Sequence, residues 1–139
     1  MYDQCVYFNI STLNRKITKI WQDEFSLLGL SPSHGYLLGA MARKPMATQK
    51  ELSEIMELDA STITRFIDAL NSKKLIEKVS TGKGAKFRLT PEGKTLSLRT
   101  DELMNSLFSN MQNSLGETKF ANLINSLQQT KQSLQETEA

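Results

Sequence analysis

The sequence has few of the residues that metal sites, disulfide frameworks and most active sites require. Its 139 residues include one cysteine, Cys5, and one histidine, His34. A single cysteine excludes an intramolecular disulfide and a thiolate zinc cluster. No acid–base pair and no phosphate-binding glycine loop stands at the spacing of a known active site. We therefore expect no metal, no cofactor, no catalytic residue and no enzymatic activity.

Long apolar runs are absent as well. No segment approaches the roughly 18 consecutive apolar residues that a bilayer-spanning helix needs, and the N-terminus lacks the pattern of a secretory signal. Hydrophobic residues make up 39% of the sequence and charged residues 23%, which is typical of a globular domain with an ordinary core. We expect a cytoplasmic protein that does not contact a membrane.

The net charge of +2 excludes little, but the charge is unevenly distributed. Residues 73–88 carry six cations and one carboxylate, a net charge of +5, so the rest of the chain sums to −3. A basic patch on a nearly neutral molecule is typical of an element that binds phosphates. A solvated, lysine-rich hairpin would have the same composition, and charge alone does not separate these alternatives.

Apolar periodicity predicts two helices before a helix-turn-helix. Apolar residues recur in steps of three and four over residues 6–28, which predicts one long helix that ends at Gly29. Ser31 and Pro32 are the N-cap and first residue expected of a second helix. That helix should stop before Pro45, because the residue ahead of a proline disfavours helical geometry.

The helix-turn-helix is predicted between residues 48 and 72. Thr48 and Glu51 stand at the spacing of a capping box, and Asp59 can cap the next helix after a tight turn. The apolar side chains expected to point inward from the third helix are Leu52, Ile55 and Met56. Those expected to point inward from the fourth helix are Ile63, Phe66, Ile67 and Leu70.

After residue 75 the pattern changes from helix to strand. Residues 76–80 and 86–89 are short extended stretches around a glycine-containing turn, which predicts a β-hairpin, or wing. Thr90 and Pro91 then begin a fifth helix, and Gly116 separates it from a sixth. The predicted fold class is mainly α with a small β-hairpin wing, a winged helix-turn-helix with flanking N- and C-terminal dimerisation helices.

We expect one domain over residues 1–139, with the DNA-binding lobe at about 31–92 and dimerisation helices at about 1–28 and 93–135. A lobe of this size cannot cover the apolar faces of three long flanking helices, and monomers rarely expose patches so large. Pairing of two copies about a twofold axis would cover them. An intramolecular bundle is the alternative.

The polar face of the fourth helix is expected to read DNA. A major groove admits a helix, and arginine to guanine is its commonest specific contact. The residues expected to lie on this recognition face are Ser61, Thr62, Thr64, Arg65 and Asp68. The residues expected to contact the DNA backbone from the third helix and the wing are Thr48, Gln49, Lys73, Lys83 and Lys86. The alternative function is a winged-helix module that binds another protein and has no operator of its own.

Three segments carry a resemblance to a known family. LGLSPSHGYLLGAM, TQKELSEIMELDASTITRFIDALNSKKLIEK and FRLTPEGK resemble the MarR family, the multiple-antibiotic-resistance regulators, and the likeness extends from Met1 to about Gln132. It implies a homodimeric repressor that binds a palindromic operator in double-stranded DNA and is released by a small ligand or an oxidant. The wing departs from the family pattern, because its tip, TGKGAK, lacks the usual arginine, and lysine has no planar fork for minor-groove contacts.

The resemblance also suggests regulatory sites. Cys5 lies where the organic-hydroperoxide-sensing branch has its cysteine, but Asn9 and Lys19 stand where that branch has supporting tyrosines. Cys5 is therefore either a redox sensor or an inert residue of a dimer interface. The residues that could line a pocket for a small aromatic effector, as in relatives, are Trp21, His34 and Tyr36. Ordinary packing is the alternative for each of them.

Overall fold

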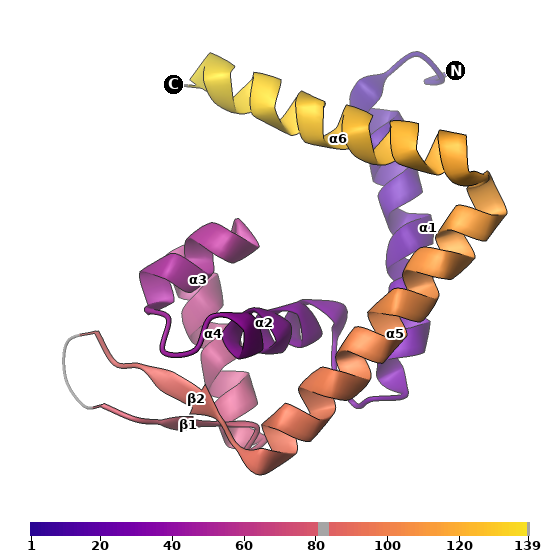
Figure 1. Cartoon of the computed structure of the whole chain (residues 1–139). Coiled ribbons are helices and arrows are strands. Elements are labelled where there is room, and N and C mark those ends of the chain that lie inside the picture. Colours follow the sequence, from indigo (N-terminus) through magenta and orange to yellow (C-terminus); the bar gives the residue numbers. More distant parts are fainter. Residues whose placement is uncertain (81–83, 139) are drawn as a thin grey trace. The chain divides into compact units, whose positions relative to one another are not determined.

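The computed structural model describes residues 1–80 and 84–138, which form helices and one β-hairpin. In chain order the elements are α1 (Val6–Ser26), α2 (Pro32–Arg43), α3 (Gln49–Met56), α4 (Ala60–Ser72), β1 (Ile76–Lys78), β2 (Phe87–Leu89), α5 (Pro91–Leu115) and α6 (Glu117–Glu138) (Figure 1). The chain forms two compact units, Met1–Leu103 and Met104–Ala139, and α5 contributes to both. The predicted fold class, a winged helix-turn-helix with flanking helices, is confirmed.

The predicted caps determine where the lobe helices begin. Ser31 Oγ accepts a hydrogen bond from the His34 amide at 3.2 Å, and Pro32 occupies the first position of α2. At the start of α3, Thr48 Oγ1 accepts from the Glu51 amide at 3.1 Å while Glu51 Oε1 accepts from the Thr48 amide at 3.4 Å. Each cap satisfies an amide that has no partner within its helix.

The lobe core lies where α2 packs on α1, α3, α4 and β2, and where α4 packs on α3 and β1. Its fully buried apolar side chains are Phe25, Leu37, Leu38, Leu52, Ile63, Ile67, Leu70 and Ile76. Ile55, which we expected to point inward, is 49% exposed. It lies in the last turn of α3, just before the chain turns away at Glu57 with φ of 52°, so this eight-residue helix buries only a narrow face.

The wing is a two-stranded antiparallel hairpin between α4 and α5 (Figure 1). Ile76 is opposite Leu89 and Lys78 is opposite Phe87. Both strands are shorter than predicted, although the Val79 amide still donates to the Lys86 carbonyl at 2.9 Å beyond the last strand pair. Residues 81–83, which include the predicted tip residue Lys83, lie outside the described residues.

The start of α5 is held closely against the end of α4. Thr90 Oγ1 donates to the Lys74 carbonyl at 2.7 Å and accepts from the Gly93 amide at 3.1 Å. A Cβ on Gly93 would lie 1.9 Å from the Leu75 carbonyl oxygen. Only glycine allows the two backbones to approach so closely.

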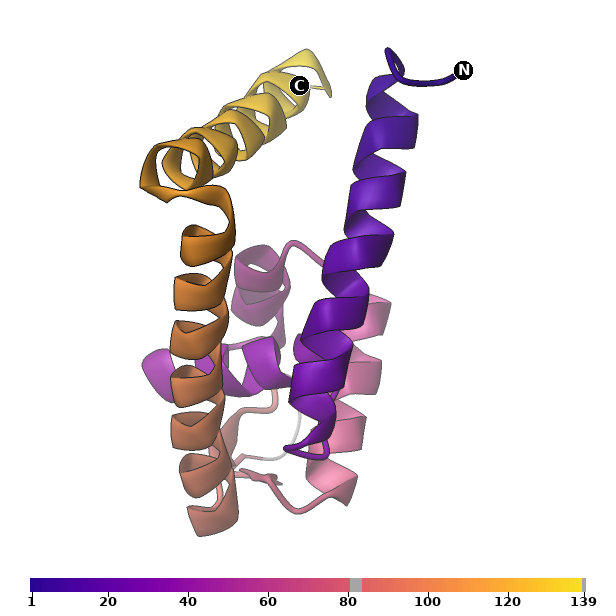
Figure 2. The same ribbon diagram turned by 90° about the vertical axis from the view of Figure 1, so that its right-hand side faces the viewer.

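The apolar stripe of α1 is mostly uncovered. Phe25 is the only buried residue of the helix, at its C-terminal end, and the N-terminal half of α1 extends past α2, α3 and α4 (Figure 2). Its exposed apolar residues are Val6, Tyr7, Phe8, Ile10, Leu13 and Ile20. None of the described helices is both long and apolar enough to cross a membrane.

The second unit has its own aromatic contact. Phe108 of α5 and Phe120 of α6 meet edge to face, with ring centroids 4.9 Å apart. Gly116 joins the two helices with φ of 84°, a backbone geometry that favours glycine. On α6, Ile124, Leu127 and Leu134 remain exposed.

Candidate nucleic-acid interface

The exposed face of α4 is positioned by a cap at one end and by the lobe core on the opposite side. Asp59 Oδ1 accepts from the Thr62 amide at 2.8 Å and from Ser61 Oγ at 2.9 Å. These hydrogen bonds, of which the one from the Thr62 amide has the largest effect, hold the pKa of Asp59 below its usual value. The cap therefore carries a full negative charge at neutral pH. The carboxylate therefore stabilises the positive end of the helix.

The predicted recognition residues lie on the face of α4 that points away from the core. Ser61, Thr64, Arg65 and Asp68 are exposed and Thr62 is half-buried. Arg65 Nη2 donates to Thr62 Oγ1 at 3.2 Å, which leaves most of the five guanidinium donors available for a ligand. This surface offers short hydroxyls around one long cation, as the sequence indicated.

The N-terminus of α3 adjoins this face. Thr64 Oγ1 donates to Gln49 Oε1 at 3.3 Å and to the Ala60 carbonyl at 3.0 Å, so Gln49 joins the recognition residues directly. Thr48 lies beside it, half-buried, with its hydroxyl used in the cap. Lys50 is exposed at the same helix end. It was not among the predicted backbone contacts, although a lysine in the first turn of the helix was a visible signal.

Intramolecular pairs neutralise part of the positive charge around the lobe. Arg88 Nε donates to Glu77 Oε1 at 2.6 Å across the wing. Lys44 pairs with Glu51, and this bond, followed by the Thr48 amide, lowers the pKa of Glu51. Glu77 is already counted in the net charge of +5 over residues 73–88, so the pairing leaves that charge unchanged and only occupies one of its six cations.

The predicted backbone contacts from the end of α4 and from the wing differ in their surroundings. Lys73 Nζ donates to the Gly29 carbonyl at 2.8 Å, so this ammonium ties the end of α4 to the turn after α1. Lys86 is half-buried on the wing, next to β2. The third of these lysines, Lys83, is not among the described residues.

Only two of the three predicted pocket residues come together. Trp21 Nε1 donates to Tyr36 Oη at 3.0 Å, and both line a hollow of about 430 Å³ between α1 and α2. His34 packs elsewhere, edge-on against Phe66 of α4 with ring centroids 4.8 Å apart. Burial, and secondarily the charge of Lys73, lowers the pKa of His34.

Cys5 is the N-cap of α1 and is exposed. Its Sγ accepts from the Phe8 amide at 3.5 Å, and Asn9 Nδ2 donates to the Cys5 carbonyl at 2.9 Å. The Tyr2 ring lies against Phe8, with centroids 5.3 Å apart. No group of three or more potential metal ligands occurs among residues 1–80 and 84–138.

Comparison with known proteins gives a family match over part of the chain. Residues 28–86, which contain the helix-turn-helix and the first strand of the wing, match the model of the MarR family. No curated protein matches the chain in sequence at a significant level.

Solved structures share the fold over nearly the whole chain. A MarR/EmrR family regulator from Acinetobacter sp. ADP1 is 16% identical, with a TM-score of 0.83 over 98% of this chain and 99% of that one. A mutant MarR from E. coli, solved with operator DNA, is 20% identical, with a TM-score of 0.81 over 94% and 97%. The S. aureus MepR–DNA complex is 14% identical, with a TM-score of 0.82 over 96% and 99%.

The family match covers the segment that carries the helix-turn-helix, and the shared fold extends to the flanking helices. Residues 28–86 of the chain are thus similar to the MarR family, and the fold that MarR-family structures share extends over nearly its whole length.

Proposed function

We propose that this protein represses transcription as a homodimer on a palindromic operator, with one α4 in the major groove of each half-site. The observation that carries the proposal is the exposed face of α4. There Arg65 lies among hydroxyl side chains, while Ile63, Ile67 and Leu70 anchor the opposite face in the core. Arginine can donate two hydrogen bonds to a guanine edge, and small neighbours allow close approach of the backbone.

Two solved relatives support DNA as the partner. The E. coli MarR mutant was solved in complex with operator DNA and the S. aureus MepR in complex with DNA, and both share the fold of this chain. In this chain Gln49 bonds to Thr64 of the recognition face and Lys50 is exposed beside it, and both would contact phosphates in the proposed complex. Lys86 would add a phosphate contact from the wing, which fixes orientation without reading bases.

Pairing of two copies is supported by α1. Its exposed apolar residues, from Val6 to Ile20, recur at helical spacing over more than three turns, and a second copy is the simplest cover for such a stripe. A twofold pair would present two α4 helices to half-sites about 34 Å apart, one turn of DNA.

The hollow beside Trp21 and Tyr36 supports release by a small aromatic ligand. The hydrogen bond between these side chains joins α1 to α2. A ligand that replaced it would change how the dimerisation helix meets the DNA-binding lobe, and so the spacing of the two α4 helices.

Arg65→Ala tests the DNA proposal. An operator selected from a random duplex pool is compared with random duplex by fluorescence anisotropy over a series of salt concentrations. Arg65→Ala should lose about 1–3 kcal/mol of discrimination between the two duplexes. Lys86→Ala should weaken binding to both duplexes by the same factor. It should also reduce the slope of log affinity against log salt concentration by about one.

Arg99→Ala is the matched control, because it removes an exposed arginine from α5 and should change neither measurement. Unaltered discrimination in Arg65→Ala would count against the docking of α4. If the wild-type protein bound neither duplex, the result would favour the alternative function, a winged helix that contacts another protein.

A further inference from the structure

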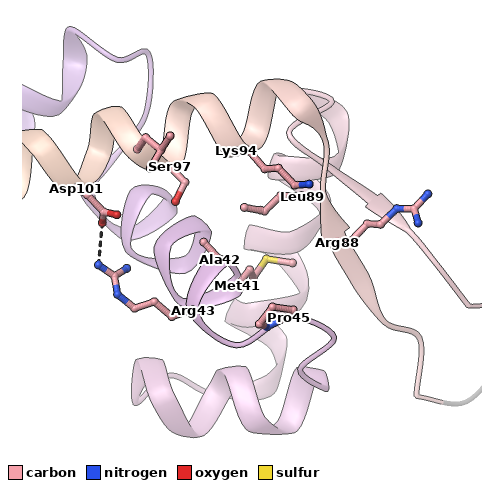
Figure 3. Close-up of a pocket in the computed structure, with 10 residues that line it drawn as sticks. Met41, Ala42, Arg43, Pro45, Arg88, Leu89, Lys94, Ser97 and Asp101 are labelled. Atoms are coloured by element: carbon pink, nitrogen blue, oxygen red, sulfur yellow. Dashed lines mark hydrogen bonds and ion pairs between the residues drawn. The ribbon is translucent and has the colours of Figure 1, made fainter.

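A second cavity lies within the Met1–Leu103 unit, away from the Trp21–Tyr36 hollow. It has a volume of about 580 Å³, within the usual range for small-molecule sites, and shares no lining residue with that hollow. Its walls come from the end of α2, the turn before α3, β2 and the first turns of α5 (Figure 3). It therefore adjoins both the helix-turn-helix and the wing.

One face of α5 forms one wall. Lys94, Ser97, Leu98 and Asp101 follow the spacing that places residues on one side of a helix, and Ser97 and Asp101 project toward α2 in Figure 3. The apolar residues that form the other walls are Met41, Ala42, Pro45 and Leu89. No aromatic side chain is among the described residues that line this cavity.

The polar groups at the two ends of this face differ. Asp101 Oδ1 accepts from Arg43 Nη2 at 2.8 Å, which closes one end with an ion pair. Ser97 is only 3% exposed as a residue, and its hydroxyl has no hydrogen-bond partner among the described residues, but the oxygen is not among the fully buried unpartnered atoms, so it can be reached from the cavity. The Lys94 ammonium likewise has no ion-pair partner in the part of the chain that the structure describes. Both groups can therefore bond to a ligand without giving up a partner within the described chain.

We propose that this cavity binds an aliphatic monocarboxylate whose carboxylate contacts Lys94 and Ser97 and whose chain lies against Met41, Leu89 and Leu98. One unpaired ammonium and one unpaired hydroxyl match a single carboxylate. A second carboxylate would meet Asp101, about 10 Å along the helix from Lys94, and be repelled. Aliphatic walls without aromatic rings suit a flexible chain better than a planar ring, which would gain from stacking.

A regulatory consequence rests on the proposed DNA-binding function. The bound chain would touch α2 of the lobe and Leu89 of the wing together, so it would fix the position of the wing relative to α4. A carboxylate in this cavity would then change the affinity for operator DNA through the wing contacts rather than through the bases read by Arg65.

The test is calorimetric titration of octanoate into the whole protein with no DNA present. Octanoate should bind, about fourfold more tightly for each methylene added from hexanoate. Octanol, which has no charge, should bind at least about tenfold more weakly. Lys94→Met should weaken octanoate binding by about tenfold or more, and Lys94→Arg should retain most of it.

Two hydroxyl variants give a matched comparison. Ser97→Ala should weaken octanoate binding several-fold, since it removes a hydrogen bond to the carboxylate. Thr100→Val should leave the affinity unchanged. Thr100 is also fully buried on α5 with an unpartnered hydroxyl, but it does not line the cavity.

Absence of octanoate binding, equal affinity of wild type and Lys94→Met, or octanol binding as tightly as octanoate would each overturn the site. Thermal melting of every variant shows whether it folds. If Lys94→Met melts early, Lys94→Gln replaces it in the same titration. Because no DNA is present, a failure of octanoate to bind would not count against the DNA-binding proposal tested with Arg65→Ala. Likewise, a failure to bind operator DNA would not change the interpretation of the octanoate titration.

Discussion

Helices α4 and α1 have similar amphipathic sequences but very different surroundings. In α4, Ile63, Ile67 and Leu70 are at most 1% exposed, since α2, α3 and β1 pack against them. In α1, Ile10 is 49% exposed and Ile20 is 46% exposed. An apolar stripe therefore predicts that a helix face will be covered, but it does not say whether the same chain supplies the cover.

This difference separates residues that stabilise the lobe from residues available for association. The lobe covers its own apolar residues, so changes there should lower the free energy of unfolding of a single chain. The stripe on α1 has few partners in its own unit, so changes there should act mainly on pairing. Three experiments, on the core, on two glycines and on His34, test this contrast.

The largest effect is expected for a core leucine. Leu38 is fully buried in α2, and Leu38→Ala should lower the free energy of unfolding by about 2–5 kcal/mol through lost burial and a residual cavity. Ile10→Ala should lower it by less than about 1 kcal/mol in dilute protein but weaken self-association. Urea denaturation and sedimentation equilibrium measure the two quantities. Equal losses of unfolding free energy would remove the contrast.

Substitution of either of two glycines by alanine should lower the free energy of unfolding by a smaller amount. Gly93→Ala should cost about 3 kcal/mol of unfolding free energy, because the new Cβ would clash with the Leu75 carbonyl at 1.9 Å. Gly116→Ala should cost about 1–2 kcal/mol through its left-handed backbone alone, since no described residue beyond its chain neighbours comes within 4 Å of the added Cβ. Thermal and urea denaturation of both variants tests the order. A Gly93→Ala protein as stable as wild type would show that α5 can move away from α4 freely.

The smallest effect is a pH dependence located in the lobe. Burial, and next the Lys73 charge, lowers the pKa of His34 in the folded chain, so the unfolded chain binds a proton more readily near pH 6.5. The contribution of neutral His34 to the free energy of unfolding is then fully present above that pH. It falls as the pH drops through 6.5 toward the folded-state pKa. The melting temperature should decrease between pH 7.5 and 5.5, and less so in His34→Gln. The same decrease in both proteins would exclude His34 as the cause.

The sequence was most informative where interactions are local. The caps at Ser31, Thr48 and Asp59 were all predicted, because each side chain bonds an amide only three residues away. The polar face of α4 followed from the same periodicity that placed its apolar residues in the core. The prediction that Ile55 points inward was wrong, because a helix of eight residues is too short for periodicity to define the width of its buried face.

Contacts between distant segments could not be predicted in this way. His34 was grouped with Trp21 and Tyr36 by residue type, but the fold turns it toward Phe66 on α4. Nothing near Lys94 or Ser97 in the sequence marks them as neighbours of Met41 and Leu89, because the cavity forms only when α5 packs beside α2 and the wing.

The sequence by itself determined the order of the helices, their first residues and the face of α4 that carries Arg65, since these depend on interactions within one or two helical turns. Only the tertiary structure decided which charged and polar groups remain available. Lys73 bonds a carbonyl 44 residues away and Arg88 is paired across the wing, whereas Lys94 has no ion-pair partner in the described chain. The physical reason is that a long side chain binds whatever the fold brings within reach, and the fold brings together residues that are far apart in the sequence.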